Sequence, residues 1–212
     1  MRYKRNQVEE AISHLLDPNS SQPTQDLRTK LKRLLETDRA LARSREQNGV
    51  DFAFFSADPP GRGVEIWFSA YEAFALLNGV RLMGHGWPQG LAVSVMRRVR
   101  RELEDQHRRI VEQDPGWLFD QEAIGNNARA GDYAFDNQDA VLLTVVSNSG
   151  SLPGQETALF ECKICQGAAA AHGFFWKVSK GQGALTMFEV ATLAHRLLWE
   201  LVKTEPRFRG RS

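Results

Sequence analysis

Basic side chains that recur along one predicted helix are the first candidates for chemistry in this sequence. Arg28, Lys32, Arg39 and Arg43 follow one another at steps of four, seven and four residues, which places them along one face of a helix. Lysine and arginine on such a face can contact phosphates, and each contact adds salt-dependent affinity through counterion release. Charged residues that only solvate the outside of an amphipathic helix give the same pattern, so both interpretations stay open.

A predicted loop carries a further basic residue. Arg62 stands in a turn-forming segment between two aromatic and β-branched runs, 50–55 and 64–68, which predict a two-stranded hairpin. A helix with a basic face and a hairpin with an arginine on its loop can place the helix in the major groove and the hairpin on flanking phosphates. The candidate DNA-binding residues are Lys4, Arg5, Arg28, Lys32, Arg33, Arg39, Arg43 and Arg62.

Other residue types give weaker signals of chemistry. Cys162 and Cys165 have the spacing of a redox dithiol or half of a zinc site, but a strand would point them to opposite faces, and no second cysteine pair exists. The 5 histidines are scattered, and no fingerprint of a hydrolase, metalloprotease, P-loop or dinucleotide-binding protein occurs. Three aspartates at 132, 136 and 139 lack EF-hand spacing. We therefore expect no catalytic residue, metal or cofactor.

Charge is distributed unevenly along the chain. Its 212 residues include 27 basic and 26 acidic side chains, for a formal net charge of +1. Residues 1–113 hold 18 basic and 15 acidic side chains, residues 114–160 hold 1 and 7, and residues 161–212 hold 8 and 4. Near neutrality is thus a cancellation between segments, and any DNA affinity has to come from one helix face and one loop.

The apolar segments are too short for a membrane protein. The longest run, residues 140–146, falls far short of the roughly 20 residues that a membrane span needs. The basic N-terminal residues are followed by an amphipathic segment rather than by the apolar region of a signal peptide. We therefore expect a cytoplasmic protein.

Caps and apolar periodicity predict the elements that must position the basic residues. Capping boxes at 6–9, 69–72 and 186–189 and a cap at Thr24 predict four helices, and Pro88 suits the first turn of a fifth, which runs to about residue 113. Strands are predicted at 140–147, 158–165 and 173–179. The helix that follows Pro88 has a near-heptad apolar seam that can pair with a second copy, formed by Met96, Val99, Leu103 and Ile110.

The run 63–98 resembles the middle of MerR-like transcription regulators. In that family a wing strand ends in an aromatic–serine pair, and a helix, a glycine-containing turn and a helix leading into a dimerisation segment follow. The matching pieces here are Trp67-Phe68-Ser69, the helix to Met83, the turn 84–88 and the helix from Gln89. The resemblance covers at most residues 1–113, and it departs from the family in the long loop 17–24 and the long second helix.

Together these patterns predict an α+β protein in which a winged-helix-like region (α-α-β-β-α-α) precedes a small three-stranded antiparallel sheet and a helix. Residues 1–113 are expected to bind DNA and dimerise, 114–139 to form an acidic connector, and 140–212 to bind an effector or protein partner. The resemblance implies a homodimeric, sequence-specific transcription regulator that binds double-stranded DNA and has no enzymatic activity. The alternative is a protein–protein interaction or adaptor module that does not bind DNA.

Overall fold

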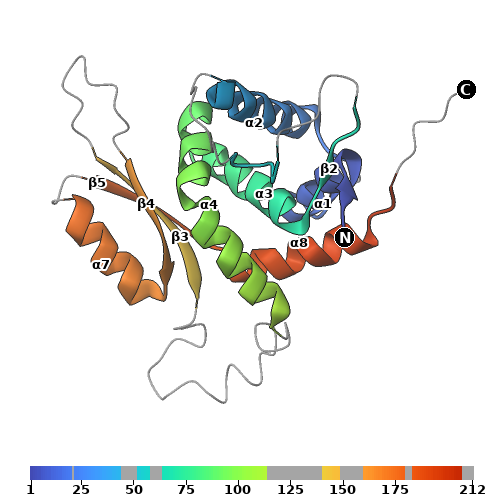
Figure 1. The fold of residues 1–212 in the computed structure, drawn as a ribbon. Helices are drawn as coiled ribbons and strands as arrows, with labels where there is room; N and C mark the ends of the chain where they lie inside the picture. The colour runs from blue at the N-terminus through green and yellow to red at the C-terminus, as the bar shows by residue number, and fades with distance from the viewer. Residues whose placement is uncertain are drawn as a thin grey trace, which may run out of the picture. The chain divides into compact units, whose positions relative to one another are not determined.

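The protein has an α+β fold, in which helices accompany two small antiparallel sheets (Figure 1). The computed structural model describes residues 1–20, 22–43, 52–57, 64–113, 140–148, 160–179 and 183–206. None of the helices in these ranges is long and apolar enough to cross a membrane. The predicted connector 114–139 lies outside the described residues.

The chain packs into two units that do not follow its linear order. The first unit contains residues 1–100 together with 196–212, and the second contains residues 101–195. Residues 196–206 therefore pack with the N-terminal helices, a pairing that a division of the chain into 1–113 and 140–212 does not contain.

The first unit surrounds one almost completely buried helix, α3 (Ala70–Gly84). Phe74, Leu76 and Leu77 of this helix are at most 1% exposed. The elements packed into the same unit are β1 (Tyr3–Lys4), α1 (Arg5–Leu16), α2 (Gln25–Arg43), β2 (Trp67–Phe68), the first part of α4 (Gln89–Glu112) and the end of α8 (Ala191–Lys203). A helix that is apolar on nearly every side has to lie in a core, so α3 is the framework on which α2 is positioned.

The capping box predicted at 6–9 is wrong, because α1 begins earlier, at Arg5. The backbone N–H of Lys4 donates to Oε1 of Gln7 at 2.9 Å, and this contact closes the start of the helix. Glu9 pairs instead with Arg5, at 2.7 Å. The start is displaced because β1 pairs with β2 immediately before α1, which fixes where the extended chain turns into a helix.

The end of α8 returns to α1. Nε2 of Gln7 donates to the carbonyl oxygen of Thr204 at 2.6 Å, and Nδ1 of His14 lies 3.3 Å from Oε2 of Glu200. Leu201 on the same helix is 1% exposed. These polar contacts explain why residues from both ends of the chain belong to one unit.

Ser69 caps α3 as the sequence predicts. The N–H of Glu72 donates to Oγ of Ser69 at 3.1 Å, and the N–H of Ser69 donates back to Oε2 of Glu72 at 2.6 Å. We expect Ser69→Ala to lower the free energy of unfolding by about 1 kcal/mol, because a helix-terminal N–H loses its acceptor. Urea denaturation followed by circular dichroism measures this change. Ser94→Ala is the control, because that hydroxyl donates only to Gly90 of its own helix; equal stability of the two variants would contradict the capping role.

The predicted turn between α3 and α4 is confirmed. Gly86 has a φ of +86°, a left-handed conformation that glycine adopts without a steric penalty. Gln89, the first residue of α4, then contacts α2: its side-chain amide donates to the carbonyl oxygen of Arg33 at 3.2 Å and to the hydroxyl of Thr37. The turn therefore places the first residue of α4 in contact with α2, the helix that carries the basic residues.

The second unit contains a three-stranded antiparallel sheet with the strand order β4-β3-β5. The strands are β3 (Val141–Asn148), β4 (Phe160–Gln166) and β5 (Gly183–Glu189). α7 (Ala168–Ser179) packs on one face, where Ala171 and Phe174 meet Leu142 and Cys165. Within this unit, α7 and the C-terminal half of α4 lie on opposite sides of the sheet (Figure 1).

The strand predicted at 173–179 is wrong, because these residues form the second half of α7. Four consecutive alanines precede them, and alanine has the strongest helix propensity. Ala171 and Phe174 face the sheet at a spacing of three residues, which is a helical rather than an alternating pattern. The aromatic composition of the segment favoured a strand, and the helical preference of the residues before it prevails.

The third strand is β5, which lies where the capping box 186–189 predicted the start of a helix. β5 pairs with β3 over its whole length, from Gly183 opposite Asn148 to Glu189 opposite Leu142. The last helix begins only after this strand, and Glu189 caps it by accepting hydrogen bonds from the N–H groups of Ala191, at 2.6 Å, and of Thr192. The predicted capping box at 186–189 is therefore wrong. Thr186 lies in β5 instead of capping a helix, and Glu189, which was predicted inside the first turn of the helix, is the residue that caps it.

Candidate nucleic-acid interface

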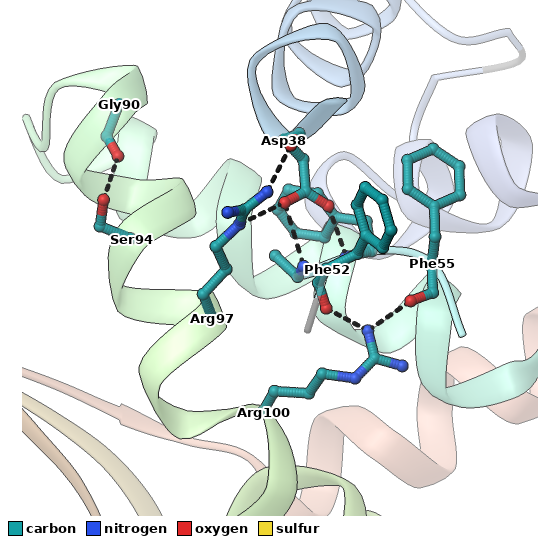
Figure 2. A network of polar contacts seen from close by, with 9 residues as sticks. Asp38, Phe52, Phe55, Gly90, Ser94, Arg97 and Arg100 are labelled. Atoms are coloured by element: carbon teal, nitrogen blue, oxygen red, sulfur yellow. Dashed lines mark hydrogen bonds and ion pairs between the residues drawn. The ribbon is translucent and has the colours of Figure 1, made fainter. Parts of the chain in front are cut away.

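A buried carboxylate fixes the inner face of α2. Asp38 is 0% exposed, and its two oxygens accept hydrogen bonds from the backbone N–H groups of Ala53, at 3.1 Å, and Phe54, at 3.0 Å. Nε of Arg97 on α4 donates to the same carboxylate at 2.7 Å, and a second guanidinium nitrogen donates to the backbone carbonyl of Asp38 (Figure 2). One aspartate therefore joins α2, the segment 52–57 and α4.

Arg100 completes this network one turn further along α4. Its Nη1 donates to the carbonyl oxygen of Phe52 and, at 2.7 Å, to that of Phe55 (Figure 2). The hydroxyl of Tyr71 donates to the carbonyl oxygen of Arg100 at 3.2 Å, and the guanidinium lies over the Tyr71 ring, 5.4 Å from its centroid. The carbonyl groups of Phe52 and Phe55 therefore each have a donor, and the buried guanidinium has two carbonyl acceptors and an aromatic ring beside it, as buried polar groups require.

The predicted hairpin with strands at 50–55 and 64–68 is wrong for the residues that the structure describes. Residues 52–57 form no strand, and β2 pairs with β1, with Phe68 opposite Tyr3. The physical reason is the network of Asp38 and Arg100. Asp38 accepts hydrogen bonds from the N–H groups of this segment, and Arg100 donates to its carbonyl groups, so these groups are not free to bond to a second strand. Arg62, placed on the hairpin loop, lies outside the described residues.

The outward face of α2 exposes basic side chains. Lys32 is 63% exposed, and Arg33 is also exposed, on the side of the helix away from Asp38. Nζ of Lys32 lies 3.8 Å from Oε1 of Glu36, and Nε of Arg28 lies 3.7 Å from Oε2 of Glu9 on α1. We call Arg28, Lys32 and Arg33 the outward basic face. Arg28 lies at its margin, because its Nε is buried although 43% of its side chain is exposed.

Arg39 does not join this face. Its guanidinium lies over the Phe55 ring, 5.1 Å from the centroid, and its Nε and Nη2 atoms are buried without a hydrogen-bond partner. The residue is thus turned toward the core segment that Asp38 and Arg100 organise. The side chain of Arg43 lies outside the described residues, so its predicted contact with DNA stays a prediction.

The two N-terminal candidates are engaged within the chain. Lys4 is 5% exposed, its Nζ lies 3.1 Å from Oε1 of Glu65, and the ammonium lies over the Trp67 ring. Arg5 is 40% exposed and pairs with Glu9 at 2.7 Å. Lys4 is held in place because β1, which contains it, pairs with β2, which contains Trp67.

The four residues of the predicted dimerisation seam are buried. Met96, Val99, Leu103 and Ile110 are 0%, 2%, 0% and 3% exposed. The apolar stripe of α4 therefore packs within the chain, and this burial accounts for its near-heptad spacing without a second copy.

The two cysteines point to opposite faces of β4, as alternation predicts. Cys162 lies opposite Val145 and is partly buried, whereas Cys165 lies opposite Leu142 and is 3% exposed. Both are free thiols. Among the described residues, no group of three or more histidine, cysteine, aspartate or glutamate side chains is arranged to hold a metal ion.

Two histidines of the second unit are buried close to each other. His107 on α4 is 5% exposed and His195 on α8 is 8% exposed. Burial, and to a smaller extent the charge of His195, lowers the pKa of His107 to about 4 from its ordinary value of 6.5. His107 therefore remains neutral in the folded chain throughout the mildly acidic range.

Sequence reasoning missed Asp38, Arg97 and Arg100, although one signal was present. Asp38 occupies the position between Leu34 and Leu41 in the leucine stripe of α2, and an acidic residue in an apolar stripe has to be buried with a partner. The identity of the partners depends on how α4 crosses α2, which helical spacing alone does not specify.

Comparison with models of known protein families gives no match, and comparison with curated proteins gives none either. The resemblance of residues 63–98 to MerR-like regulators therefore rests on the sequence pattern alone.

Proposed function

We propose that this protein binds double-stranded DNA through the outward basic face of α2 and acts as a transcription regulator. The observation that carries the proposal is the Asp38 network, which anchors one side of α2 to the core while Lys32 and Arg33 are exposed on the other. A rigidly held helix with basic side chains on its solvent side is the arrangement that enters a major groove or follows a phosphate backbone.

The order of the elements supports the same proposal. After the two N-terminal helices, β2 ends at Phe68, α3 follows Ser69, and a turn at Gly86 leads into α4. This is the order that the resemblance to MerR-like regulators leads us to expect around a DNA-binding helix.

The ion pairs on the outward basic face do not prevent contact with phosphates. The pairs Lys32–Glu36 and Arg28–Glu9 have nitrogen–oxygen separations of 3.8 and 3.7 Å, and both basic side chains are at least 43% exposed. The Lys32–Glu36 pair is exposed on both sides and contributes about 0–1 kcal/mol, so a phosphate oxygen can displace Glu36. Glu9 is only 13% exposed and also pairs with Arg5, so Arg28 is held more firmly than Lys32. We restrict the proposed contacts among described side chains to Arg28, Lys32 and Arg33 of α2, because Lys4 and Arg39 are turned inward and Arg5 lies on α1, paired with Glu9.

An electrophoretic mobility shift titration with mixed genomic fragments tests the proposal. We expect the wild type to shift duplex DNA at low salt and Lys32→Ala/Arg33→Ala to bind at least tenfold more weakly, because two phosphate contacts are lost. Arg108→Ala is the control, since that residue is 64% exposed but lies on the second unit. Absence of a shift by the wild type, or equal weakening by the control, would count against the proposal.

The mixed charge of α2 favours one other function, that of an adaptor for a protein partner. Besides its basic residues the helix carries Asp26, which pairs with Lys30 at 2.7 Å, and Glu36. Alternating charges recognise a complementary protein surface as readily as they recognise phosphates. Capture of a discrete protein that Lys32→Ala/Arg33→Ala no longer binds, without salt-dependent binding of duplex DNA, would favour this function.

A further inference from the structure

β5 lies at the edge of the sheet in the second unit and has one neighbouring strand. The strand order β4-β3-β5 leaves the side of β5 away from β3 without a strand among the described residues. An edge strand presents a row of backbone donors and acceptors on which another strand can form.

The backbone groups on this edge belong to Leu185 and Met187. The N–H of Val190 donates to the carbonyl oxygen of Val141 at 2.9 Å, which identifies 190 and 141 as a hydrogen-bonded pair. Because such pairs alternate with non-hydrogen-bonded pairs in an antiparallel ladder, Leu185 and Met187 direct their N–H and C=O groups away from β3. No part of the described chain accepts from or donates to these outward groups.

The side chains on this edge are apolar and exposed. Leu185 is 37% exposed and Met187 is 45% exposed, and both lie on the same face of the strand. No charged residue occurs from Gly183 to Phe188. The edge therefore combines open backbone groups with uncovered apolar surface.

The opposite edge of the sheet is different. β4 carries Glu161 and Lys163 in exposed positions, and charged side chains are a common device that prevents an edge strand from pairing with another chain. One edge of the sheet is thus protected and the other is not, although both belong to the same three strands.

We propose that β5 pairs with β5 of a second copy of this chain, antiparallel about a two-fold axis at Thr186, so that the two sheets become one. In this register Leu185 lies opposite Met187 of the second copy, and each exchanges both of its outward hydrogen bonds. Glu189 is the one charged residue of β5, and in this register it lies opposite Gly183 of the second copy, so no like charges lie opposite each other and the strand is complementary to itself. The exposed Leu185 and Met187 side chains of both copies then meet on one face.

This inference does not depend on DNA binding. It assigns the expected homodimer to an edge that is open in the described chain, instead of to the seam of α4, whose residues are buried. The residues that pair in this proposal belong to the second unit, whereas Arg28, Lys32 and Arg33 of the outward basic face belong to the first.

Size-exclusion chromatography with light scattering on the full chain tests the pairing. We expect a dimer for the wild type and a monomer for Met187→Lys, which places a charge in the interface next to the axis, and for Leu185→Pro. The N–H of Leu185 points away from β3, so proline there removes an outward donor without breaking the internal ladder. Glu161→Lys on β4 is the control and should remain dimeric. Circular dichroism confirms that each variant is folded.

Disulfide trapping tests the register. Residue 186 lies opposite itself in a non-hydrogen-bonded pair, where Cα atoms are about 4.5 Å apart, so Thr186→Cys should form a covalent dimer on oxidation. Ala184→Cys is the matched control, because it lies opposite Phe188 of the second copy and should not cross-link. A monomeric wild type, a dimer that persists in both Met187→Lys and Leu185→Pro, or cross-linking by Ala184→Cys alone would overturn the proposal.

Discussion

Replacing Asp38 with alanine should lower the free energy of unfolding of the first unit by about 3–5 kcal/mol. The carboxylate is 0% exposed and accepts hydrogen bonds from the backbone N–H groups of Ala53 and Phe54 and from the guanidinium of Arg97. Its removal leaves two backbone N–H groups and a guanidinium that is 11% exposed without their acceptor. The loss is large because a buried charge without its partner retains the full cost of its desolvation.

Urea denaturation followed by circular dichroism measures this loss against a control on the same helix. Asp26 is 71% exposed and pairs with Lys30, so Asp26→Ala should change stability by no more than about 1 kcal/mol. Asp38→Asn retains one acceptor oxygen and should lie between the two. If Asp38→Ala were no more damaging than Asp26→Ala, the network would not be what holds α2 in place.

Acidification should destabilise the second unit through His107. With a pKa of about 4 in the folded chain and an ordinary value of 6.5 when unfolded, His107 is neutral in both states above pH 6.5. As the pH falls from 6.5 to 4, the unfolded chain binds a proton that the folded chain does not. Unfolding is therefore favoured increasingly, by on the order of 3 kcal/mol once both pKa values have been passed.

His107→Gln separates this effect from the titration of carboxylates. Glutamine remains neutral, so the variant should lose less stability than the wild type between pH 7 and pH 5, whichever of the two is more stable at pH 7. His85→Gln is the control, since His85 is exposed, and it should follow the wild type. Parallel stability–pH curves for His107→Gln and the wild type would contradict the depressed pKa.

The sequence predicted correctly the starts of the two helices whose caps bind backbone groups a few residues away. Thr24 predicted α2, and its Oγ1 accepts from the N–H of Leu27 at 3.2 Å. Ser69 predicted α3, and the reciprocal bonds with Glu72 are present. The side chains of these caps reach backbone groups within three residues, so the sequence around them contains the whole interaction.

The features that the sequence did not predict depend on residues distant in the chain. The segment 52–55 has the composition of a strand, but its backbone groups bind Asp38 and Arg100, which helical periodicity placed on separate helices. β5 is a strand because β3 is available beside it, although its residues include a capping pattern.

The candidate site was predicted only in part for the same reason. Lys32 and Arg33 lie on the solvent side, as an amphipathic helix requires. Arg39 lies on an adjacent part of the same helix, and its inward position follows from the Phe55 ring, which helical spacing does not reveal.

The salt dependence of duplex binding, measured by fluorescence anisotropy, tests most directly whether the outward basic face of α2 meets phosphates. We predict that the logarithm of the wild-type affinity falls linearly with the logarithm of the salt concentration. For Lys32→Ala/Arg33→Ala the slope should be shallower by about 2, since each phosphate contact contributes about 0.9. An unchanged slope in this variant, or wild-type binding that does not depend on salt, would contradict the account.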